Sequence, residues 1–148
     1  FLFSTGTGLA PFLSIIRDPE TWERFEKVIL THGVRMVKDL AYEDLITREL
    51  PEHEFFGEAV REKLIYYPTV TRESFRNQGR LNDLIASGRL CTDIGLPPLN
   101  PETDRAMICG SPTMLKSIET LLNERGFEVS PRIGTPGDYV IERAFVER

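Results

Sequence analysis

The sequence has no long hydrophobic run and no excess of positive charge. No apolar segment approaches the roughly 18 residues that a membrane-spanning helix needs, so we expect no membrane association. The formal net charge at pH 7 is −5, whereas a domain whose surface binds nucleic acid is usually basic. The charge therefore argues against nucleic acid as a partner.

Cysteine is also scarce, with two residues in a chain of 148. Two cysteines do not make the disulfide framework of a small secreted protein, which favours a reducing compartment. Two cysteines and two histidines that are scattered without ligand spacing also give no reason to expect a metal site. We therefore expect a cytoplasmic protein without a bound metal.

The residues that are present suit one globular domain. Hydrophobic residues make up 41% of the chain and charged residues 28%, proportions that argue against disorder. The chain begins Phe1-Leu2-Phe3, without an initiator methionine or the pattern of a signal peptide. We interpret residues 1–148 as one domain of a longer protein and expect a further part upstream.

Short apolar runs alternate with helical patterns along the chain. A run such as KVILTH, at residues 27–32, suits a strand that is buried on both faces of a sheet. This alternation predicts an α/β fold, a doubly wound parallel sheet of about five strands flanked by helices. The expected strands are residues 1–4, 27–32, 63–71, 105–109 and 139–146. The expected helices begin at Pro11, run from Val37 to Pro51, span 54–62 and 81–86, and run from Pro112 to about Arg125.

Ligands of parallel α/β sheets bind beyond the carboxyl ends of the strands, where three segments of this chain would meet: 5–11, 32–35 and 109–112. In the first, the glycines of Thr5-Gly6-Thr7-Gly8 let backbone N–H groups approach an anion such as a pyrophosphate. The turn departs from the usual dinucleotide fingerprint because Pro11 stands in place of the third glycine. On these residues alone, a tight strand-to-helix turn without a ligand is an equal alternative.

Basic residues are concentrated between residues 60 and 90, where they exceed the acidic residues, although the chain as a whole is acidic. Arg72 follows a predicted strand and Arg80 precedes a predicted helix. Two guanidinium groups could hold one phosphomonoester, because arginine binds phosphate bidentately. A solvated surface with ion pairs to Glu73 or Asp83 is the alternative, and the residues alone favour it.

Cys109-Gly110-Ser111-Pro112 ends a predicted strand and begins a helix, with Ser111 as its N-cap. Cys109 could act as a nucleophile, but neither His32 nor His53 is placed to activate it. A buried thiol in a close-packed turn is therefore the better interpretation.

In this order, the motifs resemble the NADP-binding domain of bacterial ferredoxin (flavodoxin)–NADP+ reductases over essentially the whole chain. The motifs that carry the resemblance are Ser4–Phe12, His32–Arg35, Val70–Glu73, Gly79-Arg80, Cys109–Pro112 and Ala144–Arg148. The resemblance implies binding of NADP(H), and of FAD mostly through a β-barrel upstream of Phe1. It also implies a monomer that exchanges electrons with ferredoxin or flavodoxin, whose isolated nucleotide domain binds NADP(H) weakly and without turnover.

The resemblance also implies roles for individual residues. Cys109 and Glu142 would be catalytic residues, the first beside the nicotinamide and the second near the nicotinamide–flavin contact. The remaining positions would bind cofactor: Thr5, Gly6, Thr7, Gly8 and Pro11 at the pyrophosphate and nicotinamide end, Arg35, Arg72 and Arg80 at the 2′-phosphate half, Gly110, Ser111 and Pro112 beside Cys109, and Ala144 and Phe145 over the flavin ring.

Two other functions remain open on the sequence. One is the nucleotide domain of an oxygenase reductase component, many of which prefer NADH. The other is a nucleotide-binding electron-transfer subunit without hydride chemistry. Arg72 and Arg80 favour NADP over NAD, and the joint presence of Cys109, Glu142 and Phe145 argues against the non-catalytic subunit.

Overall fold

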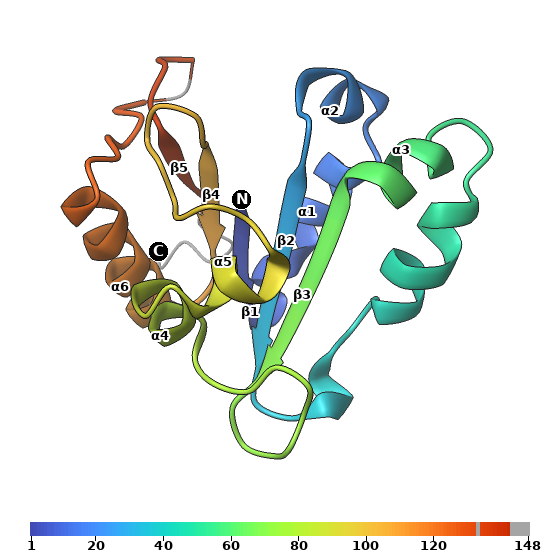
Figure 1. The fold of residues 1–148 in the computed structure, drawn as a ribbon, viewed down its shortest axis with the longest axis horizontal. Coiled ribbons are helices and arrows are strands. Elements are labelled where there is room, and N and C mark those ends of the chain that lie inside the picture. Colours follow the sequence, from blue (N-terminus) through green and yellow to red (C-terminus); the bar gives the residue numbers. More distant parts are fainter. Residues whose placement is uncertain (133, 143–148) are drawn as a thin grey trace, which may run out of the picture.

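The computed structural model describes residues 1–132 and 134–142. Its centre is a five-stranded parallel sheet in the order β3-β2-β1-β4-β5 (Figure 1). The strands are β1 (Leu2–Thr5), β2 (Val28–Val34), β3 (Leu64–Val70), β4 (Ala106–Cys109) and β5 (Tyr139–Glu142). The sheet confirms the predicted α/β class. The predicted continuation of the last strand to residue 146 lies outside the described residues.

Helices cover both faces of this sheet (Figure 1). They are α1 (Ala10–Ile16), α2 (Pro19–Arg24) and α3 (Gly57–Lys63) on one face, and α4 (Leu81–Ala86), α5 (Arg89–Ile94) and α6 (Pro112–Glu124) on the other. The chain turns to one face after β1 and to the opposite face after β4. The point where the winding changes direction therefore lies between these two neighbouring strands, which is where such sheets bind ligands.

Each face of the sheet has its own hydrophobic core. Phe12 of α1 packs in the first core and Ile118 of α6 in the second, and both are fully buried. Every position of β2 is buried, as expected for a strand covered on both faces. β3 is an edge strand, which explains how Pro68 fits into the sheet without a backbone N–H.

The prediction of one helix from Val37 to Pro51 is wrong. The structure has three short pieces instead, Val37–Asp39, Leu45–Glu49 and Leu50–Glu52, and a left-handed residue between them, Tyr42, with φ 65°. Leu40 packs in a small cluster with Val34 and Val70, whereas Ile46 enters the first core. One straight helix cannot supply both clusters, so the segment bends between them.

Two short helices, α2 and α5, were not predicted. The pair Asp18-Pro19 indicated only the end of the preceding helix, but it also starts α2, because Asp18 Oδ1 accepts the Glu20 N–H at 3.0 Å. α5 has six residues between two left-handed glycines, Gly88 and Gly95. Segments this short carry too few periodic apolar residues to be recognised from sequence.

Candidate functional site

The loops after β1 and β4 are packed directly against each other at the carboxyl edge of the sheet. A methyl group added at Gly8 would lie 2.3 Å from the Cys109 carbonyl oxygen, and one added at Gly110 would lie 2.2 Å from Thr5 Oγ1. The Ser111 N–H donates to Thr5 Oγ1 at 3.4 Å. The two predicted motifs, whose nearest glycines are Gly8 and Gly110, therefore form one surface, and only glycine fits at their contact.

Gly6 differs from Gly8, although both belong to the same motif. Gly6 has a φ of 53°, and a methyl group added there would meet no atom within 4 Å. It is exposed, whereas Gly8 is buried. Gly6 thus gives the turn its left-handed backbone and keeps an open surface beside it, while Gly8 allows the close contact with β4.

The second loop leads into the longest helix of the described chain. Ser111 is the N-cap of α6 and its Oγ accepts the Met114 N–H at 3.3 Å, with Pro112 at the start of the helix. These two residues are exposed, while Gly110 is buried beneath them. The amino end of α6 therefore faces solvent next to the glycine turn, with the positive end of the helix dipole toward it.

The predicted catalytic residues are neighbours across the sheet. Cys109 of β4 pairs in register with Glu142 of β5 on one side and with Ser4 of β1 on the other. Cys109 is fully buried, whereas Glu142 is exposed. His32 pairs with Ser4 and so lies two strands, about 10 Å, from Cys109. This spacing excludes His32 as the base for a nucleophilic Cys109, in agreement with the interpretation of Cys109 as a buried thiol.

The predicted phosphate-binding arginines follow β2 and β3 at the same edge. The Arg72 N–H donates to the Arg35 carbonyl at 2.9 Å, which joins the two loops directly after the strands. Thr69 folds the loop back toward β3, since its Oγ1 donates to the Gly79 carbonyl at 2.8 Å, and Arg80 then caps α4. All three arginines are exposed.

Neither of the predicted ion pairs forms. Glu73 instead accepts the Val37 N–H through its side chain, and Arg72 and Arg80 form no salt bridge within residues 1–132 and 134–142. The alternative that these arginines form ion pairs with Glu73 or Asp83 is therefore not supported by the described residues. Their charges remain available to an anion.

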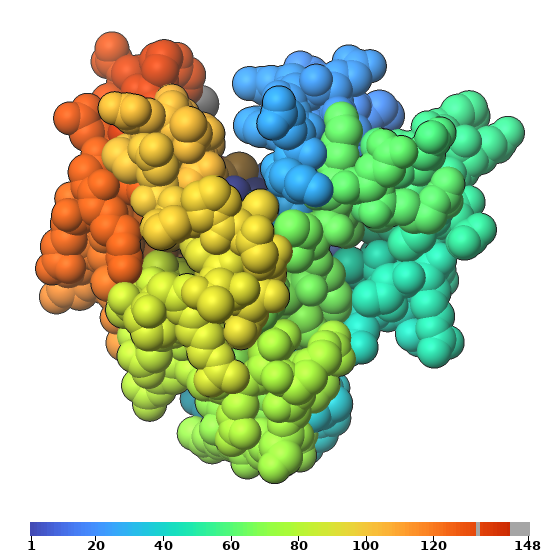
Figure 2. All heavy atoms as spheres, viewed as in Figure 1, coloured from blue at the N-terminus to red at the C-terminus, as the bar shows by residue number. Residues whose placement is uncertain are grey.

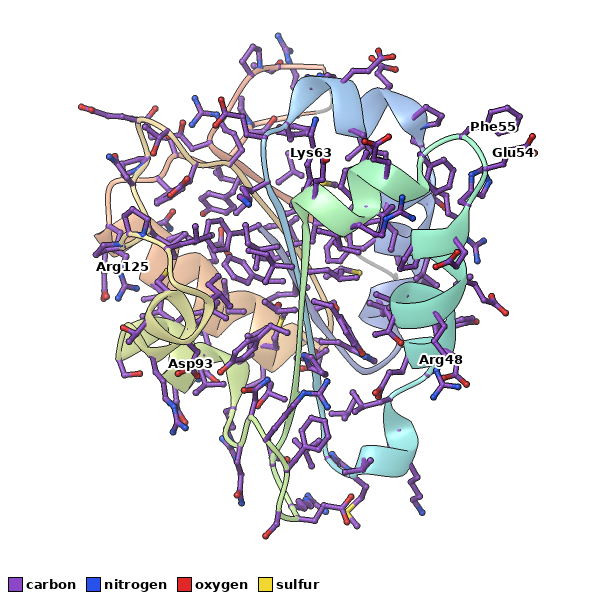
Figure 3. The ribbon with its side chains drawn as sticks, turned by 45° about the vertical axis from the view of Figure 1, so that its right-hand side comes forward. Arg48, Glu54, Phe55, Lys63, Asp93 and Arg125 are labelled. Carbon is purple, nitrogen blue, oxygen red and sulfur yellow. The ribbon has the colours of Figure 1, made fainter. Side chains whose placement is uncertain are left out.

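The predicted basic window, however, is not one patch. Lys63 precedes β3, and its Nζ donates to the Trp22 carbonyl at the opposite end of the strand (Figure 3). Arg61 likewise donates to a backbone carbonyl there, that of Pro51. The seven residues of β3 separate these two side chains from Arg72 by about 20 Å. Only the arginines after the strand can belong to the site.

His32, at the end of β2, belongs to the site although the sequence predicted no role for it. Its ring is 1% exposed, and Nε2 lies 2.8 Å from the Gly6 carbonyl oxygen. Burial lowers the pKa of His32 below its ordinary value, and the bond to Gly6 opposes this in part. In the sequence, this residue stands out by its position at the carboxyl end of a buried strand and by the motif His32–Arg35, neither of which indicates a contact with Gly6.

The lowered pKa of His32 predicts a loss of stability in acid. Above pH 6.5 the imidazole is neutral in both states, but below it the unfolded chain binds the proton more readily, so the free energy of unfolding falls as the pH decreases. The slope contributed by one group is at most about 1.4 kcal/mol per pH unit. Urea unfolding at several pH values between about 7.5 and 5.5 measures it. His32→Gln should flatten the curve, and an unchanged slope in that variant would contradict the assignment.

A pocket of about 660 Å³ lies elsewhere. It opens at the amino ends of β1, β2 and β4, with Phe1, Val28 and Ala106 among its lining residues. Figure 2 shows the hollow between the segment around residues 97–104 and the segment around residues 24–27. The predicted site residues line the opposite edge of the sheet.

Within the described ranges, no group of three or more potential metal ligands occurs, and no helix is long and apolar enough to cross a membrane. Most predicted site residues lie along the carboxyl edge of the sheet. They belong to the glycine turn, the arginine loops and the Cys109–Pro112 segment, together with Glu142. Ala144 and Phe145 lie outside the described residues.

Known proteins with similar sequences and structures show the family to which this chain belongs. The sequence matches the family described as "Oxidoreductase NAD-binding domain" over residues 2–120. The ferredoxin–NADP reductases of Pseudomonas aeruginosa and Azotobacter vinelandii are 68% and 67% identical over 148 residues, and the chain covers 57% of each. A crystal structure of a Neisseria gonorrhoeae ferredoxin NADP+ reductase with bound FAD and NADP superimposes with a TM-score of 0.81 at 31% identity, over 97% of this chain and 55% of that one. The chain spans slightly more than half the length of these relatives. It belongs to the oxidoreductase NAD-binding domain family, and all of it is similar to part of the bacterial ferredoxin–NADP reductases.

Proposed function

We propose that this chain is the NADP(H)-binding domain of a ferredoxin (flavodoxin)–NADP+ reductase, in which an upstream β-barrel domain holds most of the FAD. The observation that carries the proposal is the arrangement along one edge of the sheet. Exposed arginines that form no salt bridge with any described residue follow β2 and β3, an open glycine turn follows β1, and Cys109 and Glu142 end β4 and β5. The names and lengths of the relatives support the same proposal.

We expect an extended NADP molecule to lie along this edge, with its parts in the order of the strands. Arg72 and Arg80 would hold the 2′-phosphate, and Arg35 would reach the same half of the ligand. The start of the turn at Gly6 and Thr7 and the amino end of α6 would face the pyrophosphate, because backbone N–H groups at such places can bind an anion. The three arginines, Gly6, Thr7 and Ser111 are exposed residues, so the fit requires no rearrangement of the core.

The nicotinamide would then lie at the β4 end of the site. There Cys109 would form a packed wall beside the ring, and Glu142 would lie at its rim, one strand further out. When bound, FAD accepts a hydride from NADPH and releases electrons one at a time to a one-electron carrier. Ala144 and Phe145 would cover the flavin ring, and the barrel would set the distance between the two cofactors.

The same proposal includes the setting in which the protein works. We expect a monomeric cytoplasmic enzyme with ferredoxin or flavodoxin as its electron partner. Because the flavin would be held mostly outside residues 1–148, we expect this chain alone to bind NADP(H) without turnover.

Calorimetry with NADP+ and NAD+ tests the proposal directly. The chain should bind NADP+ at least about ten-fold more tightly than NAD+, since hydrogen bonds to charged groups contribute about 1.5–3 kcal/mol. It should not oxidise NADPH with ferricyanide, whereas the full-length Pseudomonas aeruginosa reductase serves as the positive control. Equal affinities would favour an NADH-using oxygenase reductase instead. NADPH oxidation by the isolated chain at the rate of the full-length control would contradict the proposal that the flavin is held mostly by another domain.

A further inference from the structure

We propose that His32 is a positioning residue for the nucleotide site, which holds the Gly6 carbonyl and so fixes the backbone of the Gly6–Leu9 turn against which a pyrophosphate would bind. This inference rests on the proposed function for its ligand, but the contact itself is a feature of the structure. His32 Nε2 lies 2.8 Å from the Gly6 oxygen. Because a carbonyl oxygen only accepts, Nε2 must carry the hydrogen.

The topology explains why this residue can reach the turn. His32 pairs in register with Ser4, and the pairing of β1 with β2 ends one residue later, at Thr5 and Gly33. Gly6 is the next residue of the chain and the first of the 3-10 turn. A side chain of β2 therefore extends the connection between the two strands by one bond, at the place where the backbone ladder stops.

The chemistry of the ring argues that this bond has a purpose beyond stability. His32 is 1% exposed, and its second nitrogen, Nδ1, is buried without a hydrogen-bond partner in the described part of the chain. An unsatisfied buried nitrogen destabilises the folded state, whereas an apolar side chain of similar size would not. Among the described residues, the hydrogen-bond partner of the ring is the Gly6 carbonyl in the turn of the proposed site.

The contact also determines the backbone that a ligand would meet. Gly6 is in the left-handed region, with a φ of 53° and open space on the side where a side chain would project. Glycine has few intrinsic restraints on its backbone, so a contact from outside the turn adds to the hydrogen bonds within it in keeping Gly6 in one conformation. His32 supplies such a contact from the core, opposite to the exposed surface of the turn.

Two replacements separate a positioning role from general packing. His32→Leu removes the donor but fills the space, and His32→Gln places an amide nitrogen the same number of bonds from the backbone. Thr31→Val is the matched control, because Thr31 is equally buried on β2 and donates through Oγ1 to the Leu2 carbonyl at 3.1 Å, away from the turn.

The first readout compares two ligands by calorimetry. NADP+ contains a pyrophosphate, whereas adenosine 2′-monophosphate has none and would bind only to the arginine half of the site. His32→Leu should weaken NADP+ about five-fold, as expected for one hydrogen bond, and leave adenosine 2′-monophosphate within two-fold of its original affinity. His32→Gln should restore most of the loss, and Thr31→Val should alter neither affinity. Equal weakening of both ligands, or of neither, would overturn the proposal.

The second readout needs no ligand. Amide hydrogen exchange of residues 6–9 should accelerate about five-fold or more in His32→Leu, while amides in β4 and at the start of α6 keep their rates. Uniform acceleration, or unchanged rates in the turn, would show that His32 is only a core residue. If the wild-type chain binds neither ligand, the proposed function fails, and this exchange experiment still decides the role of His32.

Discussion

Replacing Arg72 and Arg80 with alanine together is expected to abolish the preference of the chain for a ligand with a 2′-phosphate. Both side chains are exposed at the carboxyl edge, and neither has an ionic partner in the described ranges. Each single replacement should weaken adenosine 2′,5′-bisphosphate about ten-fold, at the low end for a charged hydrogen bond because solvent screens the exposed pair. Binding of AMP should change little, since it lacks the phosphate that these residues would contact.

Calorimetry at low and moderate salt measures this preference, and added salt should reduce it in the wild type. Arg48→Ala is the control, because Arg48 (labelled in Figure 3) is an exposed arginine outside the predicted site that pairs with Asp44 at 3.6 Å. A preference that survives the double replacement, or that the control also removes, would show that general charge and not these two residues selects the ligand.

Gly8→Ala is expected to have the largest effect on stability. The added methyl group would lie 2.3 Å from the Cys109 carbonyl oxygen and 2.9 Å from the Gly110 nitrogen, and these are backbone atoms that cannot rotate away. The loops after β1 and β4 would have to separate, which should cost about 3 kcal/mol, the upper end of the range for overpacking. For a domain of this size, that lowers the melting temperature by roughly 6–12 °C.

Thermal and urea unfolding measure the free energy of unfolding of Gly8→Ala and Gly6→Ala. The difference between the two variants isolates the clash of the methyl group at position 8. Gly6→Ala meets no atom, so it should cost only the roughly 1–2 kcal/mol of a left-handed backbone in a non-glycine residue. If Gly8→Ala were no less stable than Gly6→Ala, the close contact between the two loops would not exist in solution.

The parts of the fold that the sequence predicted are those with strong local signals. KVILTH is apolar enough to indicate a strand covered on both faces, and Ser111-Pro112 marks the start of α6 by capping chemistry that is purely local. The segment from Val37 to Pro51 has a helical spacing of apolar residues, yet Leu40 and Ile46 pack in different clusters. Its course depends on tertiary contacts, which a local pattern does not contain.

The candidate site shows the same division. The glycine turn and Cys109–Pro112 could be assigned to one edge because parallel strands end together. That Gly8 contacts Cys109, and that His32 reaches Gly6, depends on strand order and register. The basic window illustrates the opposite error, since sequence proximity grouped Lys63 with Arg72 although β3 places them at its two ends.

The location of bound NADP+ tests the proposed site most directly. In an NMR titration of the ¹⁵N-labelled chain, the account predicts that the largest amide shift changes occur in residues 5–9, in residues 109–113 and around Arg72 and Arg80. The pocket at the amino ends of β1, β2 and β4 should be unaffected. Shift changes confined to that pocket, or spread evenly over both edges of the sheet, would contradict the assignment of the carboxyl edge as the nucleotide site.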